Sequence, residues 1–303
     1  MGEVLLKAAT FIFMIILGYV LKKVGLFSRN DHLVISKILL NVTLPAAVIS
    51  SFGEFDMNAS LLILILLGLA CNVVLMTIGY LVSRKKDRDT IIFSMINYPS
   101  YNIGLFTLPY VQGFFGSSGV VMTCMFDIGN ALITTGGSYA ITSAVIGEQR
   151  GGRMKAILRK LSTSVPFLCY VVMLLIAVFN VKIPEIVLTF IRPIGGCNGF
   201  LAMFMIGMMF EVSRNPKYLK RAGMTLVIRY LVSAVFFVLF YFVLPFSDEM
   251  RKVLAILSFA PIGSLSPIFT EKCGGDGSLA SFTGSVSILI SIVVMTTLML
   301  VLP

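Results

Sequence analysis

Hydrophobic residues follow one another along this chain in long runs, and polar residues gather in short clusters between the runs. A run of about 20 apolar residues is long enough to cross a membrane as an α-helix. The seventh run is too long for one crossing, so Pro184 to Gly196 is expected to form a short interfacial segment before a helix that begins near Asn198. The pattern predicts ten membrane-spanning helices, at residues 3–22, 32–52, 59–83, 90–115, 119–146, 156–180, 185–213, 222–246, 249–272 and 277–302.

Composition supports this interpretation. Hydrophobic residues make up 57% of the 303 residues, charged residues make up 13%, and the mean hydropathy is +0.97. A soluble domain has about 25% charged residues, so this chain has too little polar surface for a soluble enzyme, a nucleic-acid binder or a disordered chain. The single His and five cysteines without paired spacing predict no metal site, no cofactor and no enzymatic activity.

The loop charges predict the orientation. The odd-numbered loops carry most of the 24 Lys and Arg residues, and the even-numbered loops carry only Lys182, Arg251 and Lys252. Because cytoplasmic loops hold the excess of basic residues, the odd-numbered loops are expected inside. We therefore expect a multi-pass protein of the plasma membrane (the bacterial inner membrane), in contact with the lipid bilayer, with both termini outside.

Ten spans around a basic central loop suggest two halves of five that are inverted relative to each other. The halves are expected at residues 1–146 and 156–303, with a cytoplasmic linker at 147–155. The fourth and ninth spans each contain two prolines and a glycine, which should open the helix. Opened backbone is tolerated at membrane depth only where it lines a cavity, and matched broken helices point to a secondary transporter's binding site.

Five short motifs occur in order along the chain: Leu17-Gly18-Tyr19 with Lys22-Lys23, Thr43-Leu44-Pro45-Ala46, Asn102-x-Gly104 with Leu108-Pro109, Phe126-Asp127-x-x-Asn130, and Pro261 followed by Cys273-Gly274-Gly275-Asp276. Their order and spacing resemble the auxin efflux carrier family, which includes plant PIN proteins and bacterial malonate and malate carriers. The resemblance covers essentially the whole chain. Cys273 departs from the family pattern, which usually has Tyr at this place.

The resemblance implies an all-α membrane protein with ten helices in two inverted five-helix repeats, in the elevator fold shared by NhaA and the bile-acid symporters. Helices 1, 2, 6 and 7 would form a scaffold, and helices 3–5 and 8–10 a moving transport domain. The broken fourth and ninth helices would cross at the substrate site. The implied function is secondary transport of a small organic anion, a mono- or dicarboxylate, coupled to H⁺ or Na⁺, in a homodimer.

Asn102 is the first candidate for contact with the substrate, because its amide offers two donors and an acceptor without fixing a charge in the membrane. Half-helix N-termini at the crossing would add unpaired N–H groups. Further candidates lie in the two interrupted spans: Asn97, Ser100, Pro109, Ser258, Pro261 and Ser264, with Thr107, Ser266 and Thr270 as weaker ones.

Two charged residues lie inside predicted spans. Asp127 could carry a coupling proton, or it could bond Asn130 or the broken fourth helix and hold the architecture. Arg229 is expected to extend its long stem to the membrane interface; otherwise it pairs with a substrate carboxylate or a protein acid.

Other functions were weighed against transport. Gly116-Ser117-Ser118-Gly119 has the Gly-x-Ser-Gly form of an intramembrane serine protease, but the sole histidine, His32, is expected on the opposite side of the membrane. A channel needs a ring of charges or a repeated filter, and neither is visible in the sequence. A channel or membrane receptor of the same fold remains the alternative to a carrier.

Overall fold

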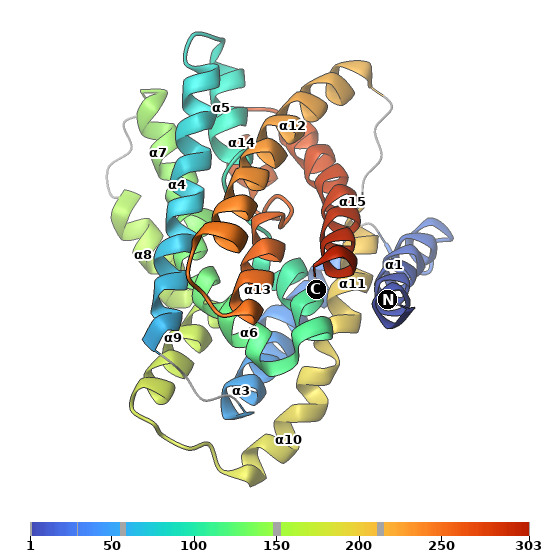
Figure 1. Cartoon of the computed structure of the whole chain (residues 1–303). Helices are drawn as coiled ribbons and strands as arrows, with labels where there is room; N and C mark the ends of the chain where they lie inside the picture. The colour runs from blue at the N-terminus through green and yellow to red at the C-terminus, as the bar shows by residue number, and fades with distance from the viewer. Residues whose placement is uncertain (1, 29, 55–58, 148–152, 211–214, 303) are drawn as a thin grey trace.

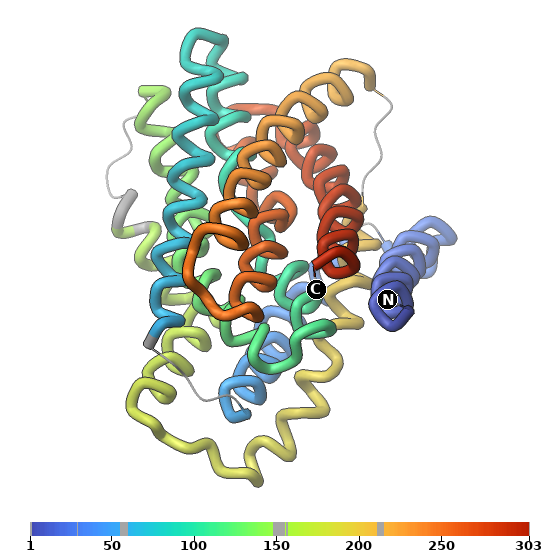
Figure 2. Tube along the Cα trace, viewed as in Figure 1, coloured from blue at the N-terminus to red at the C-terminus, as the bar shows by residue number. Residues whose placement is uncertain are grey.

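The computed structural model describes residues 2–28, 30–54, 59–147, 153–210 and 215–302, and these residues form α-helices with short 3₁₀ and π segments. Their sole β-type pairing is one isolated antiparallel bridge between Tyr101 and Ile262. The fold is therefore all-helical, as predicted (Figures 1 and 2).

The helix bounds follow the apolar runs closely. In the first half they are α1 Gly2–Lys23, α2 His32–Ile38, η1 Leu39–Thr43, α3 Leu44–Glu54, η2 Ala59–Leu62, α4 Ile63–Ser83, α5 Arg88–Asn97, η3 Ile103–Thr107, α6 Leu108–Leu132, η4 Ile133–Gly137 and α7 Ser138–Val145. In the second half they are α8 Arg153–Thr163, α9 Val165–Val178, α10 Glu185–Gly196, α11 Asn198–Met209, α12 Pro216–Val238, η5 Leu239–Val243, α13 Asp248–Ser258, α14 Ser266–Lys272 and α15 Gly277–Val301.

Seven helices of the described residues are long and apolar enough to cross a membrane, and the bent pair Ile157–Thr163 with Val165–Val178 makes an eighth. The difference from ten has a local cause. The end of the fourth predicted span and nearly all of the fifth follow each other directly within Ile103–Val145, and two helices meet at Gly116, whose backbone is non-helical with φ of 59°. The ninth span is divided into α13 and α14, each too short to cross alone.

Two other expectations concern the connections between spans. The segment from Pro184 to Gly196, expected at the membrane surface, contains the helix α10, and α11 begins at Asn198 as expected. The linker expected at 147–155 lies largely outside the described residues.

Among the described helices, α1 packs along α11, and α3 packs against α6, α9 and α10. In addition, α4 packs along α5 and α6, α12 and α14 pack on α15, and α13 packs on α6. Figure 1 shows α5 approaching the middle of the molecule from the top of the view and α13 approaching it from below.

Glycines allow the closest contacts between helices. A Cβ at Gly18 of α1 would lie 2.1 Å from the Phe204 carbonyl oxygen of α11, and one at Gly68 of α4 would lie 2.1 Å from that of Phe126 in α6. Both distances are far inside van der Waals contact, so neither position accepts a side chain without moving backbone. Small residues let membrane helices approach closely in this way.

Aspartate caps fix the start of two helices that lead to the centre. Asp87 accepts a hydrogen bond from the Thr90 backbone N–H at 3.0 Å, and Asp276 accepts one from that of Leu279 at 2.9 Å. Hydrogen bonds from Thr90 lower the pKa of the Asp87 carboxyl below its ordinary value. The Tyr218 hydroxyl of α12 also donates to Asp276, at 2.6 Å, which ties α12 to the beginning of α15.

Candidate functional site

The first break, defined as residues 98–102, interrupts the helical path between α5 and η3. α5 ends at Asn97, two residues before Pro99, which has no backbone N–H to continue the helical hydrogen bonds. Ser100 has a φ of 71°, a left-handed conformation that is uncommon for residues other than glycine. The chain becomes helical again at Ile103, so an open loop lies deep in the protein.

The second break, defined as residues 259–265, separates α13 from α14. α13 ends at Ser258 shortly before Pro261, and Pro267 lies in the first turn of α14, where a proline is tolerated. Both breaks are where the prolines predict them. The two interrupted helices of the sequence analysis are thereby confirmed.

The two breaks cross and are joined by backbone hydrogen bonds. The Asn102 N–H donates to the Pro261 carbonyl at 2.9 Å, and the Gly263 N–H donates to the Ser100 carbonyl at 2.9 Å. Gly263 lies against Ser100, because a Cβ added there would lie 3.2 Å from the Ser100 Cβ. These two hydrogen bonds satisfy some of the backbone N–H and C=O groups that have no helical partner where the prolines interrupt the helices.

Two buried asparagines hold the first break. The Asn72 amide oxygen of α4 accepts from the Ser100 N–H at 2.7 Å, and its Nδ2 donates to Asn130 Oδ1 at 3.1 Å. The Asn130 amide donates to the Tyr101 carbonyl at 3.0 Å and accepts from the Tyr101 N–H at 3.1 Å. Asn130 also donates to Asp127 Oδ1 at 2.7 Å, so Asp127 makes the architectural contact that was one of its two expected roles.

Sequence reasoning missed Asn72. It is fully buried, and it is the amide in an otherwise strongly apolar span. The argument that singled out Asp127, a polar group at membrane depth, applies to Asn72 equally and would have found it.

Hydroxyl groups of α15 hold the second break. Ser287 Oγ accepts from the Ile262 N–H at 3.0 Å, and Ser291 Oγ donates to the Phe259 carbonyl at 2.7 Å. The Tyr230 hydroxyl of α12 lies 2.8 Å from Ser291 Oγ and donates to the Ser287 carbonyl at 2.8 Å. Each of these serines contacts the second break through one hydroxyl group. The first break, in contrast, is held by amides that make two hydrogen bonds or more.

Arg229 corrects an expectation. It does not extend to the membrane interface but is fully buried in α12, with its guanidinium at the crossing. It donates to the Tyr98 carbonyl, to the Ala260 carbonyl at 3.1 Å and to the Ser100 carbonyl at 3.4 Å, and it lies 4.7 Å from the centre of the Tyr101 ring. These carbonyls follow the C-terminal ends of α5 and α13, where helix dipoles are negative. Among the described residues, no carboxylate pairs with Arg229.

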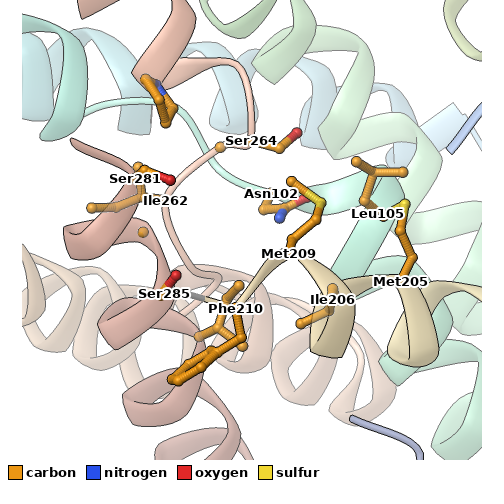
Figure 3. A pocket seen from close by; sticks show the side chains of 14 residues that line it. Asn102, Leu105, Met205, Ile206, Met209, Phe210, Ile262, Ser264, Ser281 and Ser285 are labelled. Carbon is orange, nitrogen blue, oxygen red and sulfur yellow. The ribbon is translucent and has the colours of Figure 1, made fainter. Parts of the chain in front are cut away.

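Two cavities adjoin the crossing. The larger has a volume of about 250 Å³ and reaches from the breaks to α2, α6 and α9. The smaller has a volume of about 50 Å³ and lies between the crossing, α11 and α15 (Figure 3). Its apolar wall includes Met205, Met209 and Phe210.

Asn102 and Ser264 line both cavities, and Ser100, Asp127 and Asn130 line the larger one. Figure 3 shows Asn102 among the lining side chains, close to Met209 and Ser264. Its side-chain amide has no hydrogen-bond partner among the residues that the structure describes, although its backbone carbonyl accepts from the Thr107 hydroxyl at 3.0 Å.

Ser266 also lines the larger cavity, and the other candidates have structural contacts near the crossing rather than positions on a cavity wall. Asn97 joins α5 to α14 through a 3.0 Å hydrogen bond to the Thr270 hydroxyl. Ser258 donates to the Ala255 carbonyl of its own helix at 2.7 Å. Pro261 accepts backbone hydrogen bonds, and Pro109 lies in the first turn of α6.

Beyond the crossing, along α6, aromatic rings and polar side chains pack together. The Tyr110 ring lies 5.5 Å from that of Phe11 in α1 and 4.8 Å from that of Phe114. One turn further, Ser117 donates to Glu54 of α3 at 2.6 Å, and Glu54 pairs with Arg192 at 2.8 Å. These residues line neither of the two cavities.

The whole chain was compared with known proteins. The family described as "Membrane transport protein" matches residues 4–299. This chain belongs to that family, the auxin efflux carriers. An "Uncharacterized transporter" of Methanothermobacter thermautotrophicus is 24% identical over 295 residues, with 92% of each chain covered. The auxin efflux carrier assignment made from five short motifs is thus confirmed, and the protein is a membrane transporter by family.

Proposed function

We propose that this auxin efflux carrier family member is a secondary active transporter that binds a small organic anion, a mono- or dicarboxylate, at the crossing of the two breaks. The substrate carboxylate would occupy the larger cavity beside Asn102 and Ser264. The volume of about 250 Å³ suits a small metabolite, since pockets for drug-sized ligands measure about 300–1,000 Å³.

The observation that carries this proposal is the buried charge of Arg229. Its hydrogen-bond partners are backbone carbonyls, so its positive charge is solvated by dipoles but not cancelled by an ion pair. The Pro261 carbonyl lies 3.5 Å from Arg229 Nη2 and also accepts from the Asn102 N–H, which brings this charge close to the cavity wall. In a low-dielectric interior such a charge attracts an anion more strongly than it would in water.

Asn102 is suited to bind the anion directly. Its unpartnered amide lines both cavities and can donate to a carboxylate oxygen. Asn102 also stands at the N-terminus of the helical stretch Ile103–Val145, where unpaired N–H groups and the positive end of the dipole favour negative charge. The nearby Met205 and Met209 would contact the apolar part of the substrate.

The transport cycle we propose is an elevator motion of ten spans in two inverted halves. Its scaffold would be the set containing α1, α3 and α9–α11, and its moving domain the set containing α4–α7 and α12–α15. Two pairs of residues, one member from each half, support this arrangement. Asn72 and Arg229 both bind the first break, and Asn130 and Ser287 each hold one strand of the bridge. In the sequence, Asn72 is as many residues before Arg229 as Asn130 is before Ser287.

In that arrangement the basic loops would lie in the cytoplasm and both termini outside. The cavities would then face inward, because Ser36 and Ser164 on their wall are close in sequence to basic loops. The layer of Phe11, Tyr110 and Phe114 would close the outer side. A homodimer in the plasma membrane, with H⁺ or Na⁺ as the coupling ion, completes the proposal.

The test is uptake of labelled mono- and dicarboxylates, including malate, malonate and indole acetate, into proteoliposomes. Asn102→Ala should reduce flux of the transported compound by about tenfold or more, because a direct hydrogen bond to a charged group is lost. The matched control is Asn41→Ala: Asn41 is exposed and bonds only the Lys37 carbonyl of its own helical segment.

Unchanged flux in Asn102→Ala would contradict the assignment of the site. Counterflow separates the carrier from the alternative, a channel or a receptor. A carrier accumulates label transiently against an outward gradient of unlabelled substrate, and a pore does not.

A further inference from the structure

Side-chain oxygen atoms without hydrogen-bond partners gather where α5, α7 and α14 meet. We call this place the α7 seam, formed by Asn97, Ser138, Thr142, Ser266 and Thr270. Four of these residues have a buried side-chain oxygen with no partner among the described residues, namely Asn97 Oδ1, Ser138 Oγ, Thr142 Oγ1 and Ser266 Oγ. All four side chains are at most 1% exposed.

Single unpaired hydroxyls also occur elsewhere, at Thr123 and Ser233, but at the seam four unpaired oxygens lie on three helices that pack together. Ser83 and Thr283 are equally buried, and each donates to the carbonyl four residues earlier in its own helix, at 2.6 Å and 2.7 Å. Buried polar groups are hydrogen-bonded as a rule, so a group of unpaired oxygens calls for an unseen partner.

Packing brings the helices that carry these oxygens together. The buried residues of α7 include Ser138 and Thr142, one turn apart, and α7 packs on α5 and α14. Ser143, beside Thr142, lies 3.5 Å from Cys273 at the end of α14. The buried hydroxyls of α7 therefore belong to a helix in direct contact with α14.

The other side of the seam is held by hydrogen bonds. Asn97 Nδ2 donates to Thr270 Oγ1 at 3.0 Å, and Thr270 donates to the Ser266 carbonyl at 2.8 Å. Ser266 lies one turn before Thr270, on the same face of α14. Ser266 also lines the larger cavity, which gives the seam a route to the crossing.

The orientation of the Asn97 amide follows from its partners. Its second contact, at 2.9 Å, is the Phe93 carbonyl, which can only accept, so the nitrogen must point there. The oxygen is then left facing the seam. The Asn97 oxygen is an unpaired acceptor, and the three seam hydroxyls can accept as well as donate.

We infer that the α7 seam is a binding site for a monovalent cation, Na⁺. Hydroxyl and amide oxygens are hard, neutral ligands, and a divalent ion would need carboxylates to offset its dehydration. Among the described residues, no group of three or more His, Cys, Asp or Glu is placed to hold a metal ion. The seam also lies at the C-terminal end of α5, the negative end of its dipole, which favours a cation.

This inference deepens the proposed function, and its role in transport rests on it. A cation in the seam and a carboxylate beside Asn102 would bind to the same pair of breaks, since Asn97 ends α5 and Asn102 ends the first break. Each ion would offset the charge of the other. Na⁺ would therefore be the coupling ion of the carrier.

The experiment is a thermal unfolding titration of the purified full-length protein without any carboxylate, in NaCl, KCl or choline chloride at constant ionic strength. We expect NaCl alone to raise the unfolding temperature in a saturable manner, because an ion that binds only the folded state stabilises it by mass action. Equal unfolding temperatures in the three salts would overturn the inference and would favour a buried water molecule as the partner.

The variants Thr142→Val and Ser266→Ala remove single oxygens and keep the side-chain volume nearly constant. Each should raise the NaCl concentration of the half-maximal effect about tenfold or more. Ser83→Ala, a buried serine bonded within α4, is the matched control and should leave that concentration unchanged. A Na⁺ effect that both seam variants leave unchanged would overturn the inference.

The outcome is distinguishable from failure of the proposed function. Asn102→Ala should keep the Na⁺ effect, because Asn102 does not belong to the seam. Wild-type protein that responds to Na⁺ but transports no carboxylate would disprove the proposed substrate class and leave the cation site standing.

Discussion

The two breaks cross at one point but are held by different chemistry. The first is bound by Asn72 and Asn130, whose amides accept and donate at once, and Asn130 is held in turn by Asp127. The second is bound by Ser287 and Ser291, each through one hydroxyl. Arg229 contacts the carbonyls of both.

This difference in hydrogen bonding suggests different roles for the two breaks, one holding its backbone in place and the other adjusting to the substrate. An amide that makes several hydrogen bonds fixes the backbone in two directions, and this network includes the left-handed Ser100. A single hydroxyl leaves its partner freer to turn. We therefore expect the first break, which carries Asn102, to be the rigid half of the site, and the second break, which carries Ser264, to be the half that adjusts to a substrate.

Arg229→Met should have the largest effect, because it removes the one side chain that both breaks share. Hydrogen bonds to a charged group are worth about 1.5–3 kcal/mol each, so we expect a loss of about 3 kcal/mol or more in unfolding free energy and no flux. Thermal unfolding followed with a thiol-reactive dye reports this directly, since Cys71 and Cys124 are buried and the chain has no Trp. Arg229→Lys, which keeps the charge, should recover part of the stability; a wild-type unfolding temperature in Arg229→Met would contradict the shared role.

Asn130→Ala should have an intermediate effect confined to the first break. It leaves the Tyr101 N–H and carbonyl without their side-chain partners, and an unsatisfied buried group costs about 1–3 kcal/mol. The same dye measurement should show a clear fall in unfolding temperature, smaller than that of Arg229→Met.

Asp127→Asn is the companion variant, because it keeps the shape and removes the charge. If Asp127 only holds Asn130, carboxylate flux should keep its pH dependence. A flattened pH profile would instead assign Asp127 a coupling proton and would argue against Na⁺ as the sole coupling ion.

Ser287→Ala should have the smallest effect. It leaves one buried backbone donor, the Ile262 N–H, without its acceptor at a cost of about 1–3 kcal/mol, whereas Asn130→Ala leaves two backbone groups unsatisfied. We expect a smaller loss of stability than in Asn130→Ala together with an altered KM, measured as carboxylate uptake against concentration, because the second break is the adjustable half. A stability loss equal to that of Asn130→Ala would remove the distinction between the two breaks.

The sequence predicts the breaks because their cause is local. Proline and glycine act through their own backbone, so Pro99 and Pro261 identify both interruptions without knowledge of any partner. Asn102 and Asp127 could be found in the same way, as polar residues at membrane depth.

The partners of these residues depend on how helices pack, which the pattern does not contain. Arg229 looks like a residue near a membrane interface when it is read along its own helix, and only the approach of α12 to both breaks buries it. Asn72 serves a break that begins more than 20 residues later. The non-helical backbone at Gly116, with φ of 59°, connects the fourth and fifth predicted spans directly, a connection that glycine permits but that the pattern does not specify.

The most direct test is an experimental structure of the protein with the carboxylate that gives the highest flux. The proposed function predicts density for its carboxylate group within hydrogen-bond distance of Asn102 Nδ2, with the rest of the molecule toward Met205 and Met209. Ligand density elsewhere, with the space beside Asn102 filled only by water, would contradict it.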